Sequence, residues 1–180
     1  HGISIEDIEQ LKPRLVEAHR NLQSKKLAGK LGFMELPYKI EDVKEIKRFA
    51  EKYRKKFESF IVVGIGGSAL GNIALQQALN HPNWNLLPRD GRQPSRKGWL
   101  KLFVADNVDP EFISGLLDVV DLRKTLINVI SKSGTTAESL ANFFVIREKL
   151  SKVVCKKELS EHLIFTTDRQ RGYLRELANR

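Results

Sequence analysis

The stretch Leu126–Leu140, LINVISKSGTTAESL, decides the fold of this chain. Its first five residues are mostly apolar and β-branched, which is typical of a buried strand. The sequence then turns polar over Ser131–Thr136 and takes up a helical pattern from Ala137. Thr135, followed three residues later by Glu138, has the spacing of a capping box, so we expect the helix to begin there. The stretch therefore predicts a strand, a short polar loop and a helix.

The polar loop of this stretch has the composition of an anion site. Ser131–Thr136 contributes four hydroxyl groups, one lysine and one glycine within six residues. Where a strand ends at a helix N-terminus, several backbone N–H groups stay free and the positive end of the helix dipole lies behind them. Phosphate is the anion most often bound in such a place. An ordinary capped turn is the alternative, but that turn needs one hydroxyl rather than four and a lysine. The loop therefore favours phosphate binding.

The composition of the chain is that of a globular α/β domain. Its 180 residues, 41% of them hydrophobic, are enough for one domain with a full core and a small appendage. No apolar run reaches the length of a membrane span, and no signal peptide is recognisable. The single cysteine, Cys155, excludes an internal disulfide and fits a reducing compartment. We therefore expect a cytoplasmic protein without a membrane partner.

The net charge of +9, from 31 basic and 22 acidic residues, is compatible with nucleic acid or anionic small molecules as partners. The lysines, however, are spread over the faces of predicted helices and alternate with acidic residues, as in Glu41–Lys56. No aromatic RNA-binding motif and no zinc-finger spacing occurs in the sequence. A solvated basic surface is the simpler interpretation, and we expect neither a nucleic-acid partner nor a metal site.

Residues 1–40 are predicted to form a helical N-terminal arm and linker, separate from a domain over residues 41–180. A start resembling a capping box at Ser4–Asp7 precedes apolar residues at helical spacing. Pro13 interrupts this pattern, so we expect a kink or two short helices. Glycines then end the helical pattern, and Gly32–Pro37, GFMELP, is predicted to be an extended linker.

From residue 41 the chain alternates between helix and strand patterns. The region from Asn80 to Lys97 is polar and rich in Pro and Gly, which predicts a long surface loop. The alternation predicts an α/β fold, a doubly wound parallel sheet flanked by helices on both faces. Ligands of such sheets bind beyond the carboxyl ends of the strands, where the SKSGTT loop is expected. The predicted strands are 60–63, 100–105, 126–130 and 163–166, and the predicted helices begin near residues 41, 68, 110, 137 and 173.

A second loop at the same sheet edge carries the sequence GIGGSALG, Gly64–Gly71. Its glycines let the backbone approach a ligand closely, and Ser68 stands where a helix N-cap is expected. The loop also loosely matches a dinucleotide-binding fingerprint, which makes an NAD-binding module an alternative. That alternative needs an acidic residue about 20 positions on, whereas the strand-ending Asp106 comes much later, after a long loop. A P-loop is excluded because no Lys-Ser/Thr follows the glycines. Two anion-suited loops on one edge indicate a phosphate at one loop and the rest of the ligand at the other.

Three segments together resemble the glucose-6-phosphate isomerase family, especially its bacterial form: FIVVGIGGSALG at 60–71, NVD at 107–109 and VISKSGTTAE at 129–138. The segment at 32–37 is similar to that family's N-terminal linker, so the resemblance covers nearly all of the chain. It implies two packed sugar-isomerase (SIS) domains, of which this chain would be the N-terminal arm and the first domain. It also implies interconversion of glucose 6-phosphate and fructose 6-phosphate without metal or cofactor, by a base that shuttles a proton between C1 and C2 through an enediol. The full-length protein is then expected to be a homodimer with sugar phosphates as its ligands.

The resemblance also assigns residues to the two loops. Gly67 and Ser68 would line the sugar, while the SKSGTT loop would hold the 6-phosphate through hydroxyls, the lysine and backbone amides. The candidate substrate-binding residues are Gly67, Ser68, Ser131, Lys132, Ser133, Gly134, Thr135 and Thr136.

The catalytic groups of that family are expected outside this chain. In the family a Gly-Gly-Arg loop, a glutamate base, a ring-opening histidine and a lysine follow the first SIS domain, whereas this chain ends at Arg180. We therefore expect a fragment that binds sugar phosphates and has no catalytic residue of its own. Glu138 is interpreted as a capping residue, and His19, His81 and His162 as surface or core-edge residues. A stand-alone SIS module that senses sugar phosphates is the alternative function.

Overall fold

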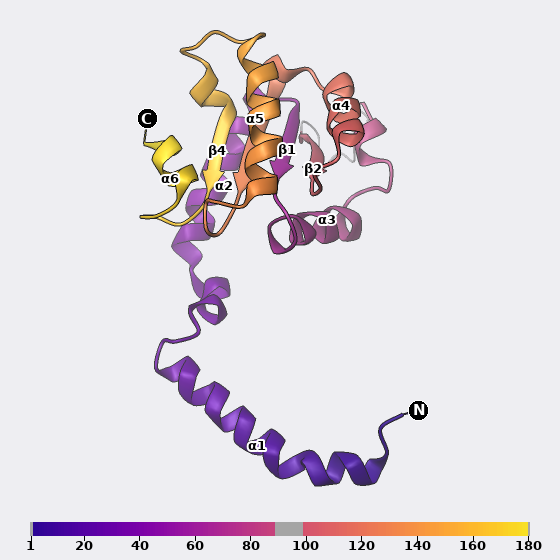
Figure 1. The fold of residues 1–180 in the computed structure, drawn as a ribbon, viewed down its shortest axis with the longest axis vertical. Coiled ribbons are helices and arrows are strands. Elements are labelled where there is room, and N and C mark those ends of the chain that lie inside the picture. The colour runs from indigo at the N-terminus through magenta and orange to yellow at the C-terminus, as the bar shows by residue number, and fades with distance from the viewer. Residues whose placement is uncertain (1, 89–98, 180) are drawn as a thin grey trace. The chain divides into compact units, whose positions relative to one another are not determined.

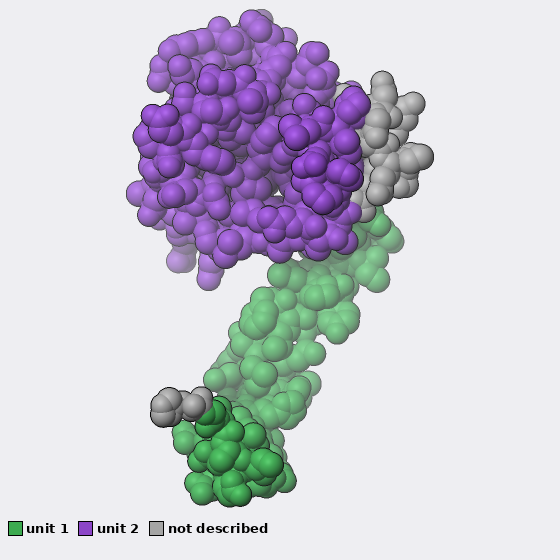
Figure 2. Space-filling view, turned by 90° about the vertical axis from the view of Figure 1, so that its right-hand side faces the viewer, with its two compact units in different colours: residues 1–49 green, residues 50–180 purple. Residues whose placement is uncertain are grey.

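The computed structural model describes residues 2–88 and 99–179. The chain divides into two compact units, residues 1–49 and residues 50–180, which Figure 2 shows in different colours. The division falls inside helix α2 (Ile40–Lys56). The domain boundary inferred from the sequence, between residues 40 and 41, precedes this division and stays a prediction.

The first unit contains the long helix α1 (Ile5–Leu27), whose start is confirmed as a capping box. The Asp7 amide donates to Ser4 Oγ at 3.1 Å, and the Ser4 amide donates to Asp7 Oδ2 at 3.0 Å. Pro13 lies inside this helix, so the expected division into two helices is wrong. A proline removes one N–H donor and crowds one carbonyl group. The remaining turns of a 23-residue helix, with good helix formers on both sides of the proline, continue across it.

The segment after α1 is a 3₁₀ helix, η1 (Gly32–Tyr38), and the prediction of an extended linker is wrong. The Met34 amide donates to the Leu31 carbonyl at 2.9 Å, and the Lys39 amide donates to the Leu36 carbonyl at 3.2 Å. Glycine and proline end an α-helix, but the φ angle that proline imposes also fits a 3₁₀ turn. The same residues that break the α-helix therefore leave a tighter helix available to the chain.

The second unit is built on a four-stranded sheet in which every pairing is parallel (Figure 1). The strands are β1 (Ser59–Val63), β2 (Lys101–Ala105), β3 (Thr125–Ile130) and β4 (Leu163–Thr166), in the spatial order β2-β1-β3-β4. Val63, the last residue of β1, lies in register with Ala105 of β2 and with Val129 of β3. The carboxyl ends of the strands therefore share one edge of the sheet, and the predicted α/β class is confirmed.

Helices flank this sheet on both faces. They are α3 (Gly67–Leu79), α4 (Pro110–Val119), α5 (Ala137–Ser151) and α6 (Tyr173–Ala178), joined by short 3₁₀ helices η2 (Trp84–Leu86), η4 (Leu122–Lys124) and η5 (Leu159–His162). Ile61 and Val63 of β1 belong to a core cluster with α4, α5 and α6. Val62 is equally buried but points to the opposite face, because side chains alternate along a strand; α3 packs against β1 and β2. The core cluster includes Ile127 and Val129 of β3, Ile113 and Leu116 of α4, Phe143, Ile146 and Leu150 of α5, and Leu174 of α6.

The predicted surface loop from Asn80 to Lys97 lies partly outside the described residues, which resume at Trp99. Its described part is more structured than the sequence predicted, since Trp84 is buried and its indole Nε1 donates to the Leu100 carbonyl at 3.0 Å. Asn85 bonds the edge strand β2 twice: its Nδ2 donates to the Leu102 carbonyl at 2.6 Å, and its Oδ1 accepts from the Leu102 amide at 2.9 Å. A side chain thus takes the place of a neighbouring strand at this position.

Candidate functional site

The candidate site lies at the carboxyl edge of the sheet, where the loops after β1 and β3 meet. These two strands are direct neighbours, so their loops leave the sheet side by side. Gly64 sits at the contact: a Cβ added there would lie 3.2 Å from the Ile130 carbonyl oxygen and 2.9 Å from Ser68 Cβ. Only a glycine lets the two backbones approach this closely. The structure therefore brings together the two loops that the sequence singled out.

The SKSGTT loop is a compact turn held by its own hydroxyl groups. Ser131 is 2% exposed; its Oγ lies 2.8 Å from Thr136 Oγ1 and accepts from the Gly134 amide at 3.1 Å. The Thr135 amide and hydroxyl both donate to Ser133 Oγ, at 3.2 and 3.0 Å. Gly134, with φ of +70°, makes the reversal that folds the loop onto itself. The hydroxyl groups that the sequence predicted as ligand contacts thus also bond one another and the loop's amides.

The candidate residues differ in their access to solvent. Lys132, Ser133 and Thr135 are exposed, and Thr136 is half-buried. Ser131 and Gly134 are buried beneath them. In the neighbouring loop Gly67 is exposed and Ser68 is half-buried. The lysine and two of the hydroxyl-bearing residues are therefore open to a ligand, while the buried pair shapes the turn.

The start of α5 corrects one prediction. The N-cap is Thr136, its side chain accepts no capping hydrogen bond, and the predicted capping box between Thr135 and Glu138 is wrong. The physical reason is that Thr135 Oγ1 bonds Ser133 and Thr136 Oγ1 bonds Ser131. Glu138 is an exposed carboxylate in the first turn, not a cap. The first amides of α5 therefore lack a capping side chain, which leaves them available to an anion.

The start of α3 corrects a second prediction. Its N-cap is Gly66, with φ of +55°, and Ser68 lies inside the first turn of a helix that begins at Gly67. The positive φ turns the chain sharply after β1, so the helix starts two residues earlier than a serine cap allows. The Ser68 amide donates to the Ile65 carbonyl at 3.1 Å. Ser68 is thus a residue of the first turn of α3 and not its cap.

The connection from β4 to α6, residues 167–172, is a third neighbour of the SKSGTT loop, and no pattern in the sequence pointed to it. The Ser131 amide donates to the Thr166 carbonyl at 3.1 Å, and the Leu174 amide donates to the Gly134 carbonyl at 3.2 Å. Asp168 shapes this connection, because its Oδ1 accepts from the Gln170 amide at 2.8 Å and from the Arg171 amide at 3.0 Å.

The same two amide bonds hold the pKa of Asp168 below its ordinary value of 3.8. A lowered pKa in the folded state means that the ionised carboxylate holds the connection above pH 3.8 and that this hold is lost as the pH falls through the lowered pKa. We expect the Gln170 and Arg171 amide resonances to shift together between about pH 5 and about pH 2, as measured by NMR. In Asp168→Asn, which has no carboxyl group to titrate, these two resonances should stay flat; a shift there would contradict the assignment to Asp168.

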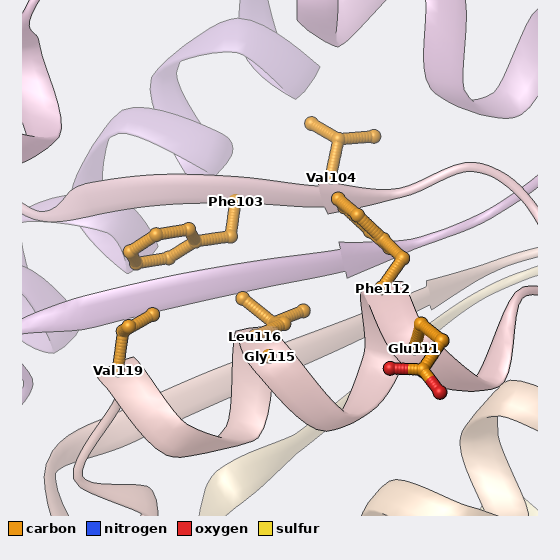
Figure 3. A pocket seen from close by; sticks show the side chains of 7 residues that line it. All are labelled: Phe103, Val104, Glu111, Phe112, Gly115, Leu116 and Val119. Atoms are coloured by element: carbon orange, nitrogen blue, oxygen red, sulfur yellow. The ribbon is translucent and has the colours of Figure 1, made fainter.

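Two hollows in the described residues lie away from the two loops. One, of about 330 Å³, lies between β2 and α4 and is lined almost entirely by apolar groups (Figure 3). Its carboxylate, Glu111, lies at the far end from Phe103 and Val119. The other, of about 200 Å³, combines Lys56, Arg123, Glu158, Glu161 and His162 near the amino ends of the strands.

His81 and His162, in the second unit, belong to neither of the two loops. His162 is buried before β4, with Nδ1 2.8 Å from the Thr125 carbonyl oxygen, and the Nδ1 of exposed His81 accepts from the Asn83 amide at 3.0 Å. Within residues 2–88 and 99–179 no group of His, Cys, Asp and Glu is arranged to hold a metal ion. In the same residues no helix combines the length and apolar character that a membrane span requires.

Comparison with known proteins agrees with this arrangement. The family model described as phosphoglucose isomerase matches residues 39–172. The glucose-6-phosphate isomerase of Carboxydothermus hydrogenoformans is 46% identical over 173 residues, which are 96% of this chain and 36% of that protein. A crystal structure of a hypothetical protein from Thermus thermophilus superposes with a TM-score of 0.76 at 36% identity, over 97% of this chain and 38% of that one. A glucose-6-phosphate isomerase from Chlamydia trachomatis superposes with a TM-score of 0.58 at 29% identity, over 73% and 22% of the two chains.

The chain thus spans well under half the length of the relatives that it matches. The resemblance noted in the sequence is confirmed over both loops, since the matched region contains Gly64–Gly71 and Ser131–Thr136. This chain belongs to the phosphoglucose isomerase family.

Proposed function

We propose that this chain is the phosphate-binding part of a glucose-6-phosphate isomerase, which interconverts glucose 6-phosphate and fructose 6-phosphate. The observation that carries the proposal is the SKSGTT loop at the uncapped start of α5, next to the GIGGS turn, in a member of this family. The uncapped amides, the exposed Lys132 and the exposed hydroxyls supply charge-assisted and neutral donors for a phosphoryl group. The sugar would then extend toward Gly67 and Ser68.

In this proposal the chain contributes binding rather than proton transfer. Holding the phosphoryl group far from C1 and C2 orients the reacting carbons, so the binding energy is used for positioning. Glu138 is an exposed carboxylate in the first turn of α5, and the buried His162 belongs to the amino-end side of β4. The base and the ring-opening group would come from polypeptide outside these 180 residues. No metal or cofactor takes part in the proposed step.

The isolated chain is expected to bind fructose 6-phosphate weakly and to show negligible isomerase turnover. The phosphate loop is present, but the groups that move the proton are proposed to lie elsewhere. Calorimetric titration with fructose 6-phosphate, fructose, inorganic phosphate and NAD separates the functions. Binding of fructose 6-phosphate and inorganic phosphate, without binding of fructose or NAD, supports the proposal. Binding of NAD instead would support the dinucleotide alternative. Measurable turnover in protein made in a host without its own isomerase would refute the assignment of the missing groups.

A stand-alone sugar-phosphate sensor, the alternative that the sequence left open, is not favoured by the comparisons, because the curated relatives are isomerases. We further expect the full-length protein to be a homodimer in the cytoplasm, acting in glycolysis and gluconeogenesis. The exposed free thiol of Cys155 fits a reducing compartment.

A further inference from the structure

The SKSGTT loop rests against the β4–α6 connection through bare backbone. Gly172 has φ of +94°, and a Cβ added to it would lie 2.2 Å from the Ser133 carbonyl oxygen and 3.1 Å from Gly134 Cα. A Cβ added to Gly134 would lie 3.2 Å from Gly172 Cα and 3.0 Å from Thr167 Oγ1. Real Cβ atoms essentially never lie as close as 2.2 Å, so a side chain at residue 172 and the present loop exclude each other.

This contact fixes the direction of two peptide groups. The Ser133 carbonyl faces Gly172, and the Gly134 carbonyl accepts from the Leu174 amide at 3.2 Å. In a trans peptide the N–H group points opposite to the C=O group. The amides of Gly134 and Thr135 therefore point away from the connection and toward the loop's hydroxyls, where they donate to Ser131 Oγ and Ser133 Oγ.

We propose that Gly172 is a positioning residue for the phosphate loop: by accepting the Ser133 carbonyl against its bare Cα, it holds the Gly134 and Thr135 amides on Ser131 Oγ and Ser133 Oγ and so fixes the hydroxyls that the loop offers to a phosphate. The inference rests on the proposed function, because it says what holds the loop in the shape that would receive the phosphate. In this proposal Gly172 acts through the loop and makes no contact with the ligand.

Asp168 shapes the β4–α6 connection that carries Gly172. It is exposed, and its carboxylate bonds the Gln170 and Arg171 amides, which bends the chain just before Gly172. Arg175 Nε adds a bond to the Asp168 carbonyl at 3.2 Å. A change at Asp168 therefore reaches the SKSGTT loop through the connection.

The test titrates the ¹⁵N-labelled 180-residue chain with fructose 6-phosphate and with inorganic phosphate, and follows the Gly134 and Thr135 amides by NMR. Gly172→Ala is expected to lower the affinity for both ligands by about tenfold or more, because the added Cβ displaces the loop and with it the hydroxyl groups that would bond the anion. Gly29→Ala is the matched control: residue 29 also has a positive φ, +68°, but no atom lies within 4 Å of an added Cβ, so its affinity should equal that of the wild type. A folded Gly172→Ala chain that binds within about twofold of wild type overturns the inference.

A second pair of variants keeps the test decisive if Gly172→Ala does not fold. Asp168→Ala and Asp168→Asn remove the same charge, but asparagine keeps an oxygen that can accept the two amide bonds. Weaker phosphate binding in Asp168→Ala with recovery in Asp168→Asn supports positioning through the connection, and equal affinity of Asp168→Ala and wild type overturns it.

The failure of the proposed function would be separate and visible. It would appear as a wild-type chain that binds neither ligand. In that case the spectra recorded without ligand still test whether Gly172 shapes the loop. Displaced Gly134 and Thr135 amide resonances in Gly172→Ala support this role, and unchanged resonances overturn it.

Discussion

Ser131→Ala is expected to weaken phosphate binding more than replacement of any exposed residue of the SKSGTT loop. The buried Ser131 Oγ joins Thr136 Oγ1 to the Gly134 amide, so its loss releases both the start of α5 and the turn at Gly134. We expect an affinity for fructose 6-phosphate lower by about tenfold to a hundredfold. The free energy of unfolding should fall by about 1–3 kcal/mol, because both hydrogen bonds of the buried Ser131 hydroxyl are lost. Calorimetric titration and urea unfolding measure the two effects.

The bond between Ser131 and Thr136 makes this prediction sharper. Thr136→Ala removes the same bond from the other side. The double variant should therefore lose less free energy of unfolding than the two single variants lose in sum. Ser160→Ala is the matched control, since Ser160 is an exposed serine in η5, before β4. Strict additivity of the two loop variants would contradict a shared bond, and an equal effect at Ser160 would show that the loss is not specific to the loop.

Phe143→Ala is expected to have the largest effect on stability. Phe143 is 1% exposed in the core and meets the Phe165 ring edge-on, with ring centroids 5.4 Å apart. Removing a buried phenyl ring leaves a cavity as well as losing transfer free energy, which costs about 3–5 kcal/mol. For a chain of this size the melting temperature should fall by roughly 10 °C or more, as measured by calorimetry.

The neighbouring residue supplies the control. Phe144 lies next along α5 but is 40% exposed, so Phe144→Ala loses less buried surface and should cost clearly less. Equal losses of unfolding free energy in Phe143→Ala and Phe144→Ala would contradict the assignment of Phe143 to the buried face of α5.

The sheet and its two loops could be predicted because their signals are local. The apolar runs that became β1 and β3 are short, β-branched and followed at once by glycine or hydroxyl residues, and these patterns hold whatever the rest of the chain does. Parallel pairing then follows from the alternation with helices, which also places both loops at one edge. The capping box at Ser4 and Asp7 was predictable for the same reason, since both partners lie within one turn.

The starts of α3 and α5 were mispredicted because local backbone and side-chain interactions override the capping pattern. Thr135 and Thr136 have the right side chains for a cap, but Ser133 and Ser131 engage their hydroxyls first. The contact between the β4–α6 connection and the SKSGTT loop could not be predicted from the sequence, for a different reason. Gly172 contacts Ser133 and Gly134 across a separation that no periodicity or spacing rule describes. Such backbone-to-backbone contacts carry no side-chain signature.

The two bonds from Asn85 to Leu102 have a consequence for the behaviour of the molecule in crowded solution. An unprotected outer strand offers its amides and carbonyls as a template on which a strand of another molecule can add, the first step toward fibres. Here one carboxamide occupies both backbone groups of Leu102, within β2. An incoming strand would have to displace that side chain before it could pair at Leu102, so among the described residues Asn85 protects this part of the sheet's flank against intermolecular growth.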